Sequence, residues 1–208
     1  KVVSDPFLVH NKIDVVRRIT GGRSVLHDIE VTYAVIAPLT GVFENQTLQQ
    51  TYQVIAKALS LAIRQLGVKE ASTLWESREK GQSNPQCFVA VSRYEISHQS
   101  RKVIGSAQKR SRDRFLQHGS ILLGFNSMLQ RGCVKEPDLE IEKKIAPLNL
   151  QLNRELSFDE VAETFARAFA STFETEMSRS EMSPAELKLA GELETKYLSP
   201  DWTRNRCR

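Results

Sequence analysis

Cysteine is scarce in this chain, and its scarcity excludes a fold held together by disulfides. The 208 residues include 3 cysteines, Cys87, Cys133 and Cys207, which are odd in number and far apart. Secreted disulfide frameworks use even, regularly spaced sets, so this pattern predicts unpaired thiols in a reducing compartment such as the cytoplasm. The sequence also lacks CxxC pairs and an HExxH helix, and we therefore expect no metal site.

Long apolar runs are also missing. No stretch approaches the roughly 20 apolar residues that cross a bilayer, and the first ten residues lack the apolar core of a secretory signal. Gly at 10 and Pro at 7 exclude collagen-like repeats and bulk disorder. Lys1 in place of Met indicates a processed or incompletely represented chain.

Positive charge is present in modest excess and is unevenly distributed. The formal net charge is +4, and residues 101–114 alone hold six basic side chains and one acidic one. Such a segment suits a nucleic acid, an acidic protein or a phosphorylated cofactor. Aromatic residues are nearly absent from it, which weakens the case for stacking on single-stranded nucleic acid. A solvated charged loop is the plainer alternative.

Strand-like and helix-like patterns predict an α+β fold, a mixed or antiparallel sheet flanked by helices. The predicted strands are residues 13–18, 31–37, 87–91, 94–97, 102–104 and 120–123, and the polar residues 69–85 predict a loop. A helix is indicated by apolar residues at three- and four-residue steps before Gly67, namely Leu48, Tyr52, Ile55, Leu59, Ile63 and Leu66.

Two more helices are predicted near the end of the chain. Ser157 and Glu160 form a capping pair before an amphipathic pattern that runs to Phe173. Ser183 and Pro184 begin the last helix. Its apolar stripe, which we expect to pack on the strands, is Leu187, Ala190, Leu193 and Tyr197.

Three short stretches carry residues suited to binding or catalysis. Residues 17–28, RRITGGRSVLHD, combine arginines with a glycine turn that is able to form an anion-binding nest, or simply a tight turn. Residues 117–120, QHGS, predict a turn before a buried strand. Cys87 begins an apolar run, where a thiol is usually a buried hydrophobe and becomes a nucleophile only beside a cation or base. Cys133 and Cys207 lie among charged residues and are interpreted as incidental.

Two of these stretches, taken in order, resemble the signatures of one family. RRITGGRSVLHDIEVTY is similar to the first signature of the lipoate and octanoate transferase/ligase family, which is related to the biotin protein ligases. RKVIGSAQKR followed by LQHGSILL is similar to the second. The resemblance implies a biotin/lipoate protein ligase-like fold. We expect residues 1–208 to form a single catalytic domain without a C-terminal accessory domain. Its part before Arg17 departs from the family, where this part is usually longer, and is expected to be short or missing here.

Within the family, two features resemble the octanoyltransferases more than the adenylating ligases. Arg23 follows Gly21 and Gly22 where ligases typically have a third glycine, and QCFVAVSRYEI is similar to the cysteine-bearing segment of transferases that form an acyl-enzyme. The resemblance implies that Cys87 takes an octanoyl group from acyl carrier protein and passes it to a lysine of a lipoyl domain. That domain belongs to a glycine cleavage H protein or to a 2-oxoacid dehydrogenase E2.

The resemblance also implies roles for further residues. Lys102 lies beside the acyl carbonyl, lowers the pKa of Cys87 and stabilises the oxyanion. Neither ATP nor metal is required, because donor and intermediate are both activated thioesters. The basic segment docks the acidic acyl carrier protein. The expected substrate-binding residues are Arg18, Gly21, Gly22, Arg23, His27, Gly105, Ser106, Ala107, His118, Gly119 and Ser120.

Other activities stay open at this point. An amidotransferase that moves octanoate between lipoyl domains also uses a cysteine, and an ATP-dependent lipoate ligase shares the fold. A degenerate member would bind a lipoyl domain or an acyl group without turnover. A nucleic-acid binder is the weakest alternative, and its binding would fall steeply with salt.

Overall fold

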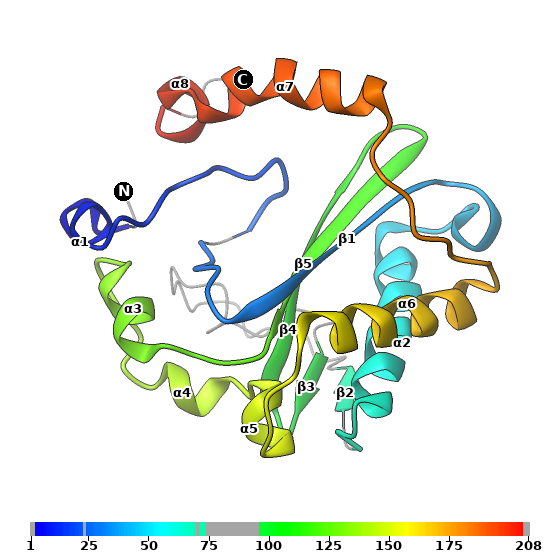
Figure 1. Cartoon of the computed structure of the whole chain (residues 1–208), viewed down its shortest axis with the longest axis horizontal. Coiled ribbons are helices and arrows are strands. Elements are labelled where there is room, and N and C mark those ends of the chain that lie inside the picture. Colours follow the sequence, from blue (N-terminus) through cyan, green and yellow to red (C-terminus); the bar gives the residue numbers. More distant parts are fainter. Residues whose placement is uncertain (1–2, 23, 70, 74–95, 206–208) are drawn as a thin grey trace.

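An antiparallel sheet forms the centre of the molecule (Figure 1). The computed structural model describes residues 3–22, 24–69, 71–73 and 96–205, and within these ranges the sheet has five strands in the order β1-β5-β4-β3-β2. The strands are β1 (Glu30–Pro38), β2 (Ala71–Thr73), β3 (Ile96–His98), β4 (Arg101–Arg110) and β5 (Arg114–Leu122). The expected α+β class with an antiparallel sheet is confirmed.

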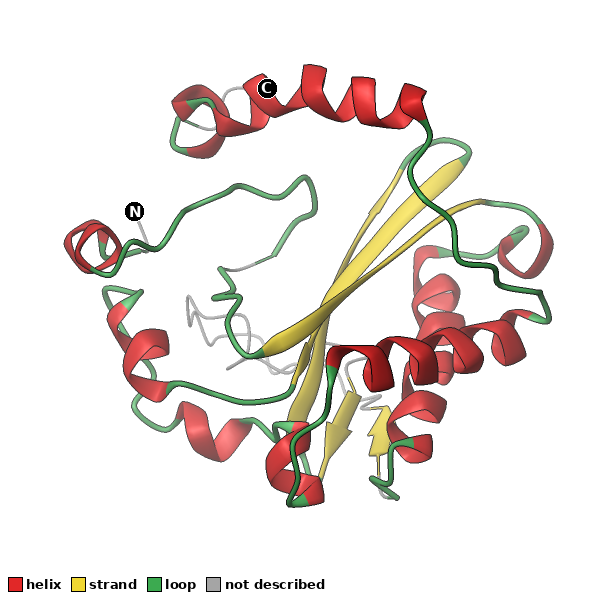
Figure 2. Ribbon diagram, in the orientation of Figure 1, coloured by secondary structure: helices red, strands yellow, loops and turns green. Residues whose placement is uncertain are grey.

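Two amphipathic helices, α2 (Leu48–Gln65) and α6 (Phe158–Phe173), cover one face of this sheet (Figure 2). Both were predicted. Thr47 forms a capping box with Gln50 at the start of α2, and Gly67 follows its end with φ +116. Ile55 and Leu59 of α2 and Phe165 of α6 lie in one buried cluster with sheet residues. Packing of the two apolar stripes on the sheet therefore builds the main core.

Short helices and a long irregular segment occupy the opposite side of the sheet. The helices are α1 (Asp5–His10), α3 (Ser127–Gly132) and α4 (Ile141–Lys144). A further short helix, α5 (Leu148–Leu152), and a 3-10 turn before α2, η1 (Gly41–Phe43), instead contribute Leu148 and Phe43 to the main core. Residues 13–18 are irregular, so the strand predicted there is wrong. No described strand pairs with this run along its length, and its side chains instead line a cavity.

The basic segment is a β-hairpin, not a solvated loop. Residues 101–110 form β4 and residues 114–122 form β5, and the two strands pair in antiparallel register. Residues 117–120 therefore lie inside a strand and not in the predicted turn. The loop predicted for residues 69–85 is interrupted by β2, which pairs with β3. The strand predicted at 87–91 lies outside the described residues.

Helix α7 (Pro184–Leu198) begins near the tip of the β4–β5 hairpin and runs away from it, and α8 (Pro200–Thr203) follows at its far end (Figure 1). Ser183 and Glu186 form the predicted capping box of α7. The expected packing of its apolar stripe is wrong, because α7 buries none of its residues and Leu187 and Leu193 are exposed. Among the described residues, no helix is long and apolar enough to cross a bilayer.

Candidate functional site

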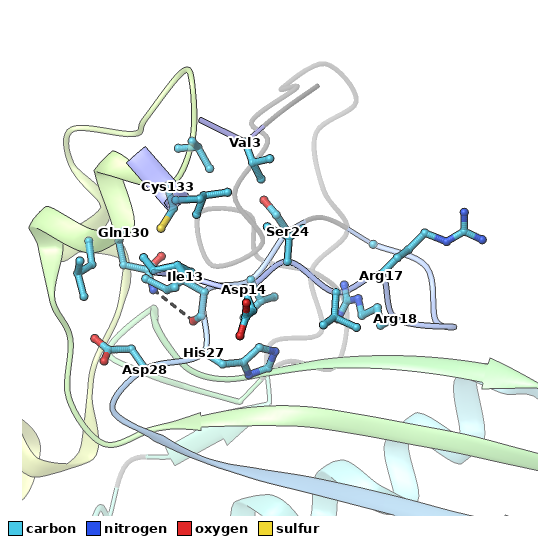
Figure 3. A pocket seen from close by; sticks show the side chains of 18 of the residues that line it. Val3, Ile13, Asp14, Arg17, Arg18, Ser24, His27, Asp28, Gln130 and Cys133 are labelled. Atoms are coloured by element: carbon cyan, nitrogen blue, oxygen red, sulfur yellow. Dashed lines mark hydrogen bonds between the residues drawn. The ribbon is translucent and has the colours of Figure 1, made fainter. Parts of the chain in front are cut away.

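A cavity of about 750 Å³ lies between the irregular segment of residues 12–22 and 24–28, helices α1 and α3, and strand β5 (Figure 3). This volume is within the range of small-molecule sites. Much of its lining is apolar, and the apolar residues include Leu8, Val15, Val25, Leu26, Leu129 and Val134. Charged side chains also line it. In Figure 3, Gln130 and Cys133 lie at one end, and Arg17 and Arg18 lie at the other.

Glu30 connects the irregular segment to the sheet at this cavity. Its side chain is 4% exposed, and its Oε1 lies 2.5 Å from His27 Nδ1. The other carboxylate oxygen accepts a hydrogen bond from Ser120 Oγ of β5. The hydrogen bond to Glu30 raises the pKa of His27, and the negative charge of Glu30 adds to this, while burial and Arg18 oppose it. His27 and Ser120, two expected site residues, are thus joined through a carboxylate.

A second contact joins the glycine turn to β5. Thr20 is buried, and its Oγ1 lies 2.7 Å from His118 Nε2. Burial lowers the pKa of His118 below its ordinary value of 6.5, and the charges of Arg18 and His27 lower it further. These effects favour the neutral imidazole of His118. Both histidines and Arg18 line the same cavity.

The two glycines of the turn differ in their surroundings. Gly22 has φ +111 and lies directly under the Arg18 guanidinium, so a side chain at this position would displace that group. Gly21 has no neighbouring atom within 4 Å of an added Cβ. Gly22 lines the cavity. Arg23 lies outside the described residues.

The two halves of the second signature pair across the sheet, but several of their side chains face the helices. Ser106 Oγ lies 2.7 Å from the Tyr33 hydroxyl, which also accepts a hydrogen bond from Gln117 Nε2 at 3.1 Å. Burial raises the pKa of Tyr33 to about 12. A Cβ on Gly119 would collide with the Gly105 carbonyl and the Tyr33 ring. Ser106 and Gly119 therefore support the packing of the sheet on the helices.

Lys102 is 1% exposed on β4, next to a bulge. The pairing with β3 skips one residue of β4, and the consecutive residues Val103 and Ile104 both belong to the main core cluster. Because a bulge shifts the alternation of side chains by one residue, Lys102 and Gly105 fall on the face opposite those two. This is the face of Ala107 and of its pairing partner His118. Lys102 is not among the residues that line the cavity, and Cys87 lies outside the described residues.

Three cavity or network residues were not expected from the sequence. Thr20 and Glu30 sit within the first signature, and the spacing of Glu30 three residues after His27 was the available signal. Cys133 is buried and lines the cavity, a placement that the sequence did not indicate, and its interpretation as incidental to the chemistry stays a prediction. Burial raises the pKa of the Cys133 thiol, as does the nearby Asp28, which disfavours the thiolate.

Known proteins resemble this chain in sequence and in structure. Residues 1–170 match the lipoyl protein ligase A/B catalytic domain. A protein of Carboxydothermus hydrogenoformans named octanoyltransferase LipM is 34% identical over 91% of this chain and 73% of its own length. A protein of the same name from Bacillus subtilis is 33% identical over 92% of the chain and 74% of its length.

Solved structures share the fold at lower identity. A lipoate-protein ligase A bound with ATP superposes with a TM-score of 0.81 at 21% identity, over 98% of this chain and 76% of the other. A bipartite lipoate protein ligase of Thermoplasma acidophilum, studied with its E2 lipoyl domain, superposes with a TM-score of 0.78 at 22% identity. The match covers 100% of this chain and 76% of the other.

Proposed function

The chain belongs to the lipoyl protein ligase A/B catalytic domain family and is an octanoyltransferase, and we propose that it works through a thioester on Cys87. The donor in this proposal is octanoyl-acyl carrier protein. The acceptor is the lysine of a lipoyl domain. The observation that carries the assignment is the similarity to octanoyltransferases over nine-tenths of the chain.

The cavity supports the choice of an octanoyl substrate. It combines an apolar lining with cationic side chains, as a substrate with a hydrocarbon tail and a polar carbonyl head requires. Each CH₂ group buried from water contributes about 0.8 kcal/mol, so an eight-carbon chain gains substantial affinity there. Leu8 and Leu129 supply such surface, while the Arg18 guanidinium offers donors to the head.

The proposed chemistry has two steps at the thioester level. The Cys87 thiolate attacks the carbonyl of the donor thioester and releases the carrier thiol. The acceptor amine then attacks the carbonyl carbon of the new thioester, and the Cys87 thiolate is released. We assign Lys102 to the acyl carbonyl, because its segment resembles the second signature of the family and because it lies on the sheet face of His118, which lines the cavity. An ammonium there stabilises the charge that develops on the carbonyl oxygen. Neither ATP nor metal takes part, and a cytoplasmic location keeps the thiol reduced.

The partners follow from the two steps. An acidic carrier protein suits the basic β4–β5 hairpin of this chain. A lipoyl domain as acceptor is supported by the shared fold of the Thermoplasma ligase, which was studied with its E2 lipoyl domain. H protein and E2 are both candidates for the acceptor.

The test is an intact mass of the protein after mixing with octanoyl-acyl carrier protein in the absence of ATP. We expect one octanoyl adduct that hydroxylamine removes. Cys87→Ser should yield no such thioester, whereas Cys133→Ser should still form it, because the Cys133 thiol is buried with a raised pKa. The Cys133 variant is thus a matched control for the loss of a thiol.

Other outcomes point to other activities. An adduct that forms only from an octanoylated lipoyl domain would replace the proposed donor and indicate the amidotransferase. Transfer that requires ATP and free octanoate would indicate a ligase. An adduct that persists in Cys87→Ser and disappears in Cys133→Ser would overturn the choice of nucleophile.

A further inference from the structure

The His27–Glu30 pair has the geometry of an oriented base at the cavity. Glu30 is almost fully buried and holds His27 Nδ1 at 2.5 Å, while Ser120 Oγ donates to its second oxygen. The His27 ring is 58% exposed and lines the cavity (Figure 3). One side of the imidazole is therefore fixed by a buried anchor, and the other side is accessible.

The partner of Nδ1 determines the tautomer of His27. A carboxylate oxygen only accepts hydrogen bonds, so Nδ1 carries the hydrogen when the imidazole is neutral. The lone pair then lies on Nε2, for which no described residue provides a hydrogen-bond partner. A nucleophile or its base is commonly oriented by a third group in this way.

Charged groups of both signs surround the pair. The described charged or titratable side chains that line the cavity with His27 are Lys12, Asp14, Arg17, Arg18, Asp28 and His118. Arg18 lowers the pKa of His27, but the Glu30 contact outweighs it and the net direction is upward. His27 is therefore a stronger base than an isolated imidazole.

The transfer reaction needs such a base. The side chain of a lysine has an ordinary pKa near 10.4, so the acceptor arrives as an ammonium that has no lone pair for attack. We propose that His27 Nε2, oriented by Glu30, takes a proton from the acceptor ammonium, with Glu30 acting as a positioning residue. This inference rests on the proposed function.

Two protons leave the acceptor nitrogen in this step. The ammonium gives one proton to His27 Nε2, and the neutral nitrogen forms a C–N bond with the thioester carbonyl carbon. The C–S bond breaks and its electron pair leaves on the Cys87 sulfur. The nitrogen loses a second proton, which the thiolate receives, and His27 returns its proton to solvent. An amide and a thiol are the products.

The experiment measures single-turnover transfer from octanoyl-enzyme, formed beforehand and verified by mass, to a lipoyl domain as a function of pH. In the wild type, the rate should rise with pH through a pKa above 6.5, because His27 must be neutral to accept a proton. Glu30→Gln should move this pKa downward and lower the plateau rate. His27→Asn, which retains a donor for Glu30, should lower the plateau by about 100-fold. The matched control is His10→Asn, which replaces an exposed histidine of α1. It should change neither the pKa of the rate profile nor the plateau rate.

A second readout separates positioning from folding. NMR titration of the His27 ring should give a lower pKa in Glu30→Gln than in the wild type, with the folded spectrum preserved. If His27→Asn and Glu30→Gln both form octanoyl-enzyme and transfer it with the pH profile and plateau rate of the wild type, this inference alone is overturned. Failure of the wild type to form octanoyl-enzyme would overturn the thioester route, and this inference with it.

Discussion

Gly22 is the residue where backbone conformation and site geometry depend on each other most directly. Its φ of +111 belongs to a region that L side chains rarely adopt, and the Arg18 guanidinium occupies the position that a Cβ on this residue would take. Arg18 in turn influences the pKa of both His27 and His118. The glycine therefore allows the turn to close and the arginine to reach the cavity.

Gly22→Ala should impair both stability and transfer. Backbone strain of about 1–3 kcal/mol is expected in the free energy of unfolding. Displacement of Arg18 should lower kcat/KM by about tenfold, which corresponds to about 1.4 kcal/mol. Urea unfolding and steady-state kinetics measure the two effects. Gly21→Ala is the control for stability, because its added Cβ meets no atom within 4 Å. Equal unfolding free energies for Gly22→Ala and Gly21→Ala would contradict the expected backbone strain at Gly22.

Helix α8 fixes one wall of the cavity from the opposite end of the chain. Trp202 Nε1 donates a hydrogen bond of 2.7 Å to the Arg17 carbonyl, and the Arg17 guanidinium lies 4.0 Å from the centre of the Trp202 ring. Arg204 forms an ion pair of 2.5 Å with Asp5 of α1. The irregular segment gains its order from these contacts and from Thr20, since it belongs to no strand or helix.

Truncation of Trp202 should increase local opening of residues 13–18 at the cavity wall without unfolding the sheet. Trp202→Phe removes the hydrogen bond and keeps an aromatic ring, and it should lower the free energy of unfolding by about 0.5–1.5 kcal/mol. Trp202→Ala removes both and should cost more. Hydrogen exchange of residues 13–18 should accelerate in both variants, and KM for the acyl donor should rise. Leu189→Ala, on the exposed surface of α7, is the control. Unchanged exchange in Trp202→Ala would show that the segment is held by other contacts.

At the scale of the whole molecule, the tip of the β4–β5 hairpin carries exposed basic side chains. Lys109 and Arg112 are exposed there. Arg110 is not a free docking group, because its Nη2 donates a hydrogen bond of 2.8 Å to Thr51 of α2. Arg114 is paired with Asp113. Lys109 and Arg112 are therefore the side chains through which the hairpin would attract an acidic carrier protein.

Charge reversal at the tip should weaken the encounter with the donor. Lys109→Glu combined with Arg112→Glu should raise KM for octanoyl-acyl carrier protein several-fold at low salt, and the difference should shrink as the Debye length falls. The double variant Lys57→Glu with Lys188→Glu changes the net charge equally at exposed sites outside the hairpin. Equal effects of the two double variants would show that net charge, and not the hairpin, determines the encounter.

Local patterns were sufficient for several elements. The spacing of Leu48, Ile55 and Leu59, together with Gly67, predicted α2 because periodicity and termination are encoded within one stretch. The capping box of α7 was equally local. The two signatures identified the family from their residue order. The strand at 13–18 failed because β-branched residues suit an irregular cavity wall as well as a sheet.

The sequence by itself determined the fold class, the family and the segments that carry the site, since these depend on residue types and spacings along the chain. Only the tertiary structure decided which residues of those segments meet. It joined Glu30 to Ser120, Thr20 to His118 and Trp202 to Arg17, contacts that span 90, 98 and 185 residues. It also left Leu187 and Leu193 of the α7 stripe exposed. Such pairings depend on strand register and packing, which no local pattern specifies.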